Sequence, residues 1–309
     1  MKDETRSAYE TAVRRAVEQI VARLDQALDL AQLAKAAALS PLHFHRIFRG
    51  ALGETPLELH RRLRLERAAH GLSHGDEPVT RIAFEAGYET HESFTRRFGE
   101  RYGVSPSQFR QNAGKARSSC ERPAPIELAA RSGLHFRPGL TASSILLTLA
   151  SGDPNMQIEI KQLPALRVAA VRHVGPYNRI SEAFERLGRI AGMAGLIRPP
   201  STQMLALYHD DPDATAPDAL RSDAAVSVPE DAQLPPELSE LRIPAGSYAT
   251  MTHLGPYSGL GDAWSRLMGA WLPGSGRRLG AGPSFEIYRN TPLDTPAEKL
   301  RTELYVSVE

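Results

Sequence analysis

The spacing of apolar residues changes once along the chain. Through residues 1–112 apolar side chains recur every three or four positions, whereas from residue 156 onward they alternate with polar ones in several short runs. The first spacing lines one face of a helix, and alternation is typical of a strand with one buried face. Residues 113–155 keep neither spacing and are interpreted as a linker. The pattern predicts an all-α domain over 1–112 and an α+β domain over 156–309.

A helix-turn-helix pattern fills residues Arg81–Arg110. Small and apolar residues lead to a turn at Gly87, and Phe94 and Phe98 then give the following helix one buried face. Two short helices joined by a tight turn that contains Gly are typical of this motif. The polar side chains opposite the two Phe residues stay outside, where a major groove can receive them. A single copy of the pattern would fit an ordinary helical hairpin equally well.

The same spacing occurs about fifty residues earlier in the chain. The matching positions are Leu33, Ala34, Ala37, Phe44, Arg46, Phe48, Gly53 and Pro56. Ser40 is expected to cap the second helix of this copy, with Pro41 in its first turn. Between the copies, residues 57–71 predict a connecting helix rich in Arg. Its Arg side chains either contact phosphate or decorate a solvated face.

The two copies together resemble the DNA-binding domain of the AraC/XylS family of transcription regulators, over about Asp25–Asn112. The Gly-Tyr, Phe-x-x-x-Phe and Gly-x-x-Pro spacings of the second copy carry the resemblance. That family holds two helix-turn-helix units on a connecting helix and reads two adjacent major-groove segments. The resemblance implies sequence-specific binding to double-stranded promoter or operator DNA, with RNA polymerase as a further expected partner.

The resemblance also places the DNA contacts at exposed positions of the two recognition helices. The expected residues are Leu42, His45, Arg46 and Arg49 in the first helix and His91, Glu92, Thr95, Arg96 and Arg97 in the second. Arg can fork onto guanine, Glu can accept from cytosine, and Leu can touch a thymine methyl group. Arg49 and Arg97 are expected at phosphates or as surface charges. The side chains at these positions do not reveal the operator sequence.

From residue 156 the chain repeats itself at a constant offset of 80 residues. HVGPY at 173–177 matches HLGPY at 253–257, and VSV at 226–228 matches VSV at 306–308. Each copy, about 157–229 and 237–309, has a strand–helix–strand–strand pattern. A tandem repeat of this kind predicts one antiparallel sheet with two helices on one side, related by a pseudo-twofold axis.

This half of the chain is similar to the GyrI-like effector-binding domain, through HVGPY, HLGPY and the terminal RTELYVSV. The resemblance implies a ligand site with a carboxylate at Glu303, and Asp223 stands at the matching position of the first copy. The aromatic residues expected around it, each of which could instead belong to the core, are Tyr257, Trp264, Trp271 and Tyr288, with Tyr177, Phe184 and Tyr208 as counterparts. A carboxylate ringed by aromatic side chains favours a cationic or amphiphilic guest.

Composition narrows the class of protein further. No apolar run approaches the ~20 residues that span a bilayer, and the N-terminus lacks a signal-peptide core. Cys120 is the only cysteine, so no internal disulfide can form and a cytoplasmic location is expected. Residues 1–155 have 22 Lys/Arg against 18 Asp/Glu, and residues 156–309 have 15 against 18. His43 and His45 do not face each other on a helix, and neither a metal nor another cofactor is expected.

These observations favour one function and leave two alternatives. The favoured function is a one-component transcription regulator that senses a small-molecule effector through its C-terminal half and is not an enzyme. One alternative is a small-molecule hydrolase in which Glu303 acts as general acid or base, although no nucleophile–base pair accompanies it. The other alternative is a C-terminal domain that binds another protein.

Overall fold

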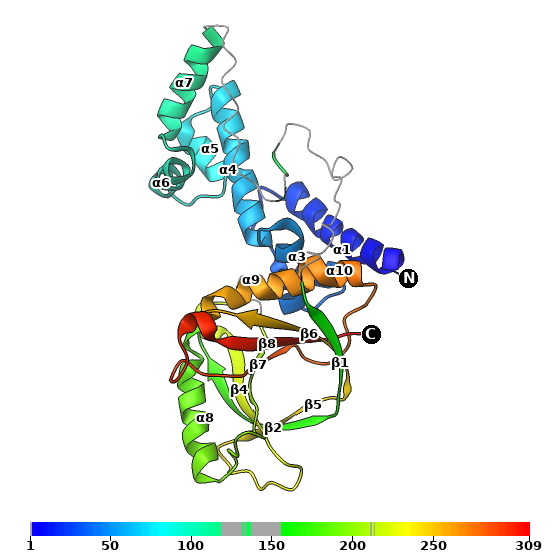
Figure 1. Cartoon of the computed structure of the whole chain (residues 1–309). Helices are drawn as coiled ribbons and strands as arrows, with labels where there is room; N and C mark the ends of the chain where they lie inside the picture. Colours follow the sequence, from blue (N-terminus) through cyan, green and yellow to red (C-terminus); the bar gives the residue numbers. More distant parts are fainter. Residues whose placement is uncertain (1, 119–131, 133, 137–155, 211, 213) are drawn as a thin grey trace. The chain divides into compact units, whose positions relative to one another are not determined.

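The computed structural model of the chain describes residues 2–118, 132, 134–136, 156–210, 212 and 214–309 (Figure 1). By their internal contacts the residues group into two compact units. Unit 1 comprises Met1–Thr11, Leu39–Ala51 and Leu149–Glu309, and unit 2 comprises Ala12–Ala38 and Leu52–Thr148. This division differs from a boundary at residue 112, because the first expected recognition helix groups with the C-terminal part of the chain.

Unit 2 is built from helices. They are α2 (Leu30–Ala36), α4 (Pro56–His74), α5 (Val79–Glu85), α6 (His91–Tyr102) and α7 (Pro106–Ser118), with the second part of α1 (Lys2–Ala22). The local sequence sets where they begin: Asp29 accepts from the Gln32 amide at 2.9 Å, and Thr55 and Glu58 form a reciprocal capping box on α4. The predicted connecting helix is α4. Of the predicted linker, residues 113–118 extend α7, and most of the remainder lies outside the described residues.

Helices α5 and α6 form the second predicted helix-turn-helix unit. Gly87 joins them at a φ of +76°, a left-handed conformation that favours glycine, and the Tyr88 amide then donates to the Ala83 carbonyl at 3.1 Å. Phe94 and Phe98 are fully buried with ring centroids 5.4 Å apart, in a core shared with α4 and α7. This packing decides which face of α6 remains outside.

Unit 1 contains an eight-stranded antiparallel sheet (Figure 1). Its strands are β1 (Ile158–Leu163), β2 (Leu166–Val174), β3 (Met204–Tyr208), β4 (Arg221–Ser227), β5 (Ser239–Ile243), β6 (Gly246–Leu254), β7 (Phe285–Tyr288) and β8 (Arg301–Ser307). The first repeat contributes helix α8 (Ser181–Met193). The second contributes α9 (Leu260–Ser265), a π-helical segment (Arg266–Trp271) and α10 (Leu272–Ser275). Most of α3 (Pro41–Leu52) and the first part of α1 complete the unit.

The strand order β1-β6-β8-β7-β3-β4-β2-β5 is symmetric about the central β3–β7 pair. Each repeat begins with a strand, β1 or β5, that precedes the strand–helix–strand–strand pattern and pairs with the other repeat. The exchange of leading strands ties the two repeats into one sheet. The predicted tandem α+β domain with an antiparallel sheet is confirmed.

The strand register decides which side chains face the helices. Helix α8 packs on strand residues that include Val226. Val226 lies opposite Met204, and Met204 lies opposite Tyr288, so the same face continues onto β7. The other face carries a separate core, which includes Phe285. Glu286, which alternates with Phe285 along β7, therefore projects to the helix-covered side.

Candidate nucleic-acid and effector sites

The second recognition helix, α6, presents the face that the sequence predicted. Glu92, Arg96 and Arg97 are exposed, and His91 and Thr95 are partly exposed. The buried Phe residues of α6 hold this polar face outward, which suits entry into a major groove. The structure confirms the exposure of Glu92, Arg96 and Arg97, whereas the hydroxyl oxygen of Thr95 is buried, and the roles of all five residues at bases or phosphates stay predictions.

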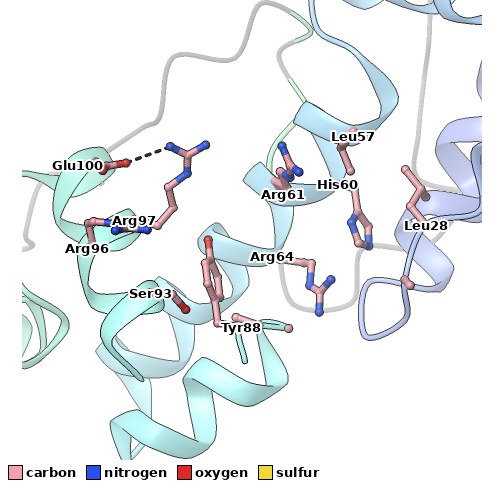
Figure 2. A pocket seen from close by; sticks show the side chains of 13 residues that line it. Leu28, Leu57, His60, Arg61, Arg64, Tyr88, Ser93, Arg96, Arg97 and Glu100 are labelled. Carbon is pink, nitrogen blue, oxygen red and sulfur yellow. Dashed lines mark hydrogen bonds and ion pairs between the residues drawn. The ribbon is translucent and has the colours of Figure 1, made fainter. Parts of the chain in front are cut away.

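A cavity of about 780 Å³ lies beside α6 within unit 2 (Figure 2). Its walls come from α4, from the turn between α5 and α6, from α6 itself and from Ala27 and Leu28, which precede α2. Arg61, Arg64, Arg96 and Arg97 all line it, and Glu100, which pairs with Arg97 at 3.0 Å, is the carboxylate of the lining. Most of the positive charge is therefore unmatched, as in a surface that binds a phosphate backbone.

Arg64 differs from the other arginines of the cavity in the burial of its guanidinium. Its Nε is buried and has no hydrogen-bond partner within the described residues. Burial lowers the pKa of Arg64, and the neighbouring charge of Arg67 lowers it further. A Cβ at Gly87 would overlap the Arg64 guanidinium, so the glycine serves both the turn and the placing of this charge. An anion that enters the cavity would therefore stabilise the charged guanidinium through charge-assisted hydrogen bonds.

The first recognition helix differs from the prediction. Leu42, His45 and Arg46 were expected on an exposed face of α3, but all three are buried within unit 1. Arg49 is partly exposed and pairs with Asp262 at 2.7 Å. The expected exposure was wrong because the apolar spacing of a helix identifies one buried face and gives no sign that a second element covers the other. The roles of these four residues on DNA stay predictions.

A buried carboxylate is the centre of a polar cluster in unit 1. Glu286 is 2% exposed and accepts hydrogen bonds from Trp264 Nε1 at 2.7 Å, from the Tyr288 hydroxyl at 2.6 Å and from the Tyr208 hydroxyl at 3.3 Å. The guanidinium carbon of Arg46 lies 3.7 Å from the centre of the Trp264 ring. We call these five residues the Glu286 cluster. It combines a carboxylate, aromatic faces and a cation away from water.

Burial dominates the electrostatics of the Glu286 cluster. It raises the pKa of Glu286, although the hydrogen bonds from Tyr288 and Trp264 and the charge of Arg46 oppose it. It also lowers the pKa of Arg46 to about 10, against the attraction of Glu286. A charged pair that leaves water loses hydration that mutual attraction only partly restores. Arg46 therefore occupies the cluster at a cost in hydration.

Most of the predicted aromatic side chains gather around Glu286. They are Tyr177, Phe184, Tyr208, Tyr257, Trp264 and Tyr288. Phe184 and Tyr257 pack edge-on against Tyr288, at centroid distances of 5.5 and 5.3 Å. Tyr177 packs edge-on against Tyr208 at 4.9 Å. Trp271 is the exception, since it makes no ring contact with the described residues. Their roles in ligand binding stay predictions.

Glu303 faces the opposite side of the sheet. In the register it lies opposite Ile287, which belongs to the core on the face away from Glu286. Arg289 donates to its carboxylate at 2.7 Å, the Tyr305 hydroxyl donates at 2.7 Å, and Lys161 Nζ lies 3.8 Å away. Burial would raise the pKa of Glu303, but these donors and charges outweigh it and lower the pKa to about 2. The structure does not bring Glu303 together with the predicted aromatic residues.

Sequence reasoning did not single out Glu286, although the chain carries a signal for it. The strand FEIY places a carboxylate between apolar residues, where an unpaired charge is costly. At the repeat offset of 80, Glu286 matches Ala206, which lies beside it in the sheet. The two repeats therefore differ at this position, with a carboxylate in the second repeat and a methyl group in the first. By contrast, Glu303 and its match Asp223 are both paired with cations, the latter with Arg172 at 2.6 Å.

Comparison with known proteins identifies a known domain in each half of the chain. Residues 156–309 match the GyrI-like small molecule binding domain, and residues 33–112 match a helix-turn-helix domain. A DNA gyrase inhibitor of Yersinia enterocolitica is 34% identical over 140 residues, which cover 44% of this chain and 87% of that protein. An uncharacterised helix-turn-helix transcriptional regulator of Bacillus subtilis is 25% identical over 226 residues, 70% of this chain and 72% of that protein.

Two further similarities cover parts of the chain. A helix-turn-helix transcriptional regulator of Mycobacterium tuberculosis is 39% identical over 82 residues, 26% of this chain and 32% of that protein. The crystal structure of the EcmrR C-terminal domain is similar at a TM-score of 0.44 and 23% identity, over 50% of this chain and 98% of that one.

The fold and the matched domains define a DNA-binding transcription regulator with a C-terminal domain that binds small molecules. The chain belongs to the GyrI-like family through residues 156–309, joined to an AraC-type helix-turn-helix domain, as its sequence predicted. None of the helices in the described part of the chain has the length and apolar character needed to cross a membrane.

Proposed function

We propose that the effector of this regulator is an aromatic or amphiphilic cation that binds at the Glu286 cluster. The observation that carries the proposal is the stacking of the Arg46 guanidinium on Trp264, beside a buried carboxylate. Aromatic faces and a desolvated negative charge attract a cation together, and the attraction strengthens as water is excluded. Glu303 is the weaker candidate, because Arg289 and Lys161 already match its charge.

On the DNA side, we propose that α6 reads bases through Glu92 and Arg96, while the arginine-lined cavity of unit 2 holds backbone phosphate. The exposed polar face of α6 and the unmatched charge of the cavity support this division of roles. RNA polymerase as a further partner and a cytoplasmic location stay predictions.

We further propose that the effector is bound and not turned over. Three donors already occupy the Glu286 carboxylate, which leaves it poorly placed to take a proton from water or substrate. Incubation of the full chain with a bound cation, followed by mass spectrometry of that compound, tests this point. Product formation that disappears in a Glu286→Gln variant would establish a hydrolase instead.

The effector proposal is tested with two small compounds of matched shape. Benzylguanidinium carries the cation that Arg46 supplies in this structure, and benzylurea is its uncharged isostere. In a calorimetric titration of the full chain we expect the cation to bind at least tenfold more tightly than the urea. Equal affinity of the two compounds, or failure of both to bind, would contradict the proposal.

A further inference from the structure

Helix α3 is docked on the second repeat within unit 1 by contacts along its length. His43 lies 3.0 Å from the Ser284 hydroxyl, and Arg49 donates to Asp262 at 2.7 Å. Between them Arg46 reaches the Glu286 cluster. The spacing of three residues between these side chains places all of them on one face of α3. That face includes Arg46 and Arg49, which the sequence assigned to DNA.

The docking also brings two backbones into direct contact. A Cβ at Gly50 would overlap the Ser265 carbonyl oxygen, and a Cβ at Gly269 would overlap the backbone of Gly50. Only glycine at both positions allows the helices to approach this closely. Gly269 lies in the π-helical segment Arg266–Trp271, which directly continues helix α9. Helix α9 carries Trp264, so the backbone that contacts α3 is continuous with the helix that supplies this ring of the cluster.

Arg46 occupies the place that a cationic effector needs. Its side chain stacks on Trp264 and is 8% exposed. Its Nη1 is buried without a hydrogen-bond partner among the described residues. A guanidinium loses hydration free energy on burial, and this loss is offset only if its N–H donors find hydrogen-bond partners. Arg46 is therefore an imperfectly satisfied cation, and a free cation, which can orient its donors without the constraint of the α3 backbone, can displace it.

We infer that Arg46 is an internal competitor of the effector: a cation that enters the Glu286 cluster displaces Arg46 and releases α3 from the second repeat. The inference rests on the proposed function, since it requires the cluster to be the effector site. Docked α3 buries Leu42, His45 and Arg46, so it cannot place them in a major groove. Release by the effector makes this reading face available. Effector binding and the release of α3 are then coupled, because the carboxylate and aromatic rings around Glu286 hold either Arg46 or the effector cation, but not both at once.

The test measures the affinity of the full chain for benzylguanidinium in the parent and in three variants. Arg46→Ala removes the competing cation, and Gly269→Leu forces α3 away together with Arg46 while leaving Glu286 and its three hydrogen-bond donors unsubstituted. Arg46→Lys keeps a competing charge. If α3 is docked in about nine molecules of ten, removing the competition raises the apparent affinity about tenfold. We expect this rise for Arg46→Ala and for Gly269→Leu, and a rise below threefold for Arg46→Lys.

Hydrogen–deuterium exchange supplies the second readout. Saturating benzylguanidinium should speed exchange of the amides of residues 42–52 in the parent, and Gly269→Leu should show fast exchange without the compound. Equal affinity of the parent, Arg46→Ala and Gly269→Leu, with unchanged exchange in α3, would overturn the inference while leaving the effector site intact. Absence of binding in the parent and in all three variants would instead overturn the proposed function.

Discussion

Replacement of Glu286 by Gln isolates the negative charge of the proposed effector site. Gln keeps the length of the side chain, and its amide oxygen can still accept from Trp264 while its amide NH2 donates to the Tyr288 hydroxyl. The substitution removes the charge from a position that is 2% exposed, where water screens it little. It should be made in an Arg46→Ala background, so that no internal cation competes in either protein.

The expected loss follows from the geometry. Two unit charges about 4 Å apart attract each other by about 4 kcal/mol at an effective dielectric constant of about 20. Because Gln retains hydrogen-bonding capacity, only part of this attraction is lost, and we expect about 2–3 kcal/mol. Since each 1.4 kcal/mol is tenfold, the affinity for benzylguanidinium should fall by about 30- to 150-fold.

Calorimetric titration measures this loss, with two comparisons. The affinity for benzylurea should change less than about threefold, because the urea carries no charge for Glu286 to attract. Glu303→Gln in the same background should leave the affinity for the cation within about threefold, since Glu303 faces the other side of the sheet. The reasoning is refuted if Glu286→Gln retains the affinity of its parent, or if Glu303→Gln shows the large loss.

Four further predictions concern DNA binding and stability. Arg64→Ala should weaken DNA binding about equally for all sequences and reduce its salt slope by about 1, whereas Arg96→Ala should cost about 1–3 kcal/mol on the selected sequence alone, both measured by fluorescence anisotropy. Gly87→Ala should lower the unfolding free energy by about 1–3 kcal/mol, because of its φ of +76° and the Arg64 guanidinium, whereas Gly99→Ala, in the open interior of α6, should not lower it. The pKa of Glu303 is lowered from its ordinary 4.5 to about 2, so the stability it contributes is present above pH 4.5 and is lost as the pH falls toward about 2. Glu303→Gln should flatten the unfolding free energy across that window, and an unchanged pH profile would contradict the assignment.

Local spacing in the sequence was enough to identify the helical half of the chain. Phe94 and Phe98 predicted the buried face of α6, and the cap at Ser40 forms as expected, with the His43 amide donating to Ser40 at 3.3 Å. These features depend on residues within one or two helical turns. Such short-range features can be predicted from the order of the side chains alone, because the interacting residues are close in sequence.

The repeat at an offset of 80 likewise predicted the tandem α+β domain, because duplicated sequence folds into duplicated structure. It did not reveal the exchange of β1 and β5 between repeats, since strand pairing depends on partners far apart in the chain. The same limit explains the choice of Glu303 over Glu286. Both are carboxylates in apolar strands, and only the neighbouring strands decide that one meets Arg289 and the other meets Trp264.

The sequence by itself determined two duplicated modules, their secondary structure, the exposed face of α6 and the aromatic residues available for a ligand. Tertiary structure alone decided that the polar face of α3 is covered, that Arg46 reaches Trp264, and that Glu286 is the buried carboxylate among the aromatic rings. The physical reason is one of range. Helical periodicity and capping act between neighbours in sequence, whereas desolvation and ion pairing depend on every element that closes over a side chain.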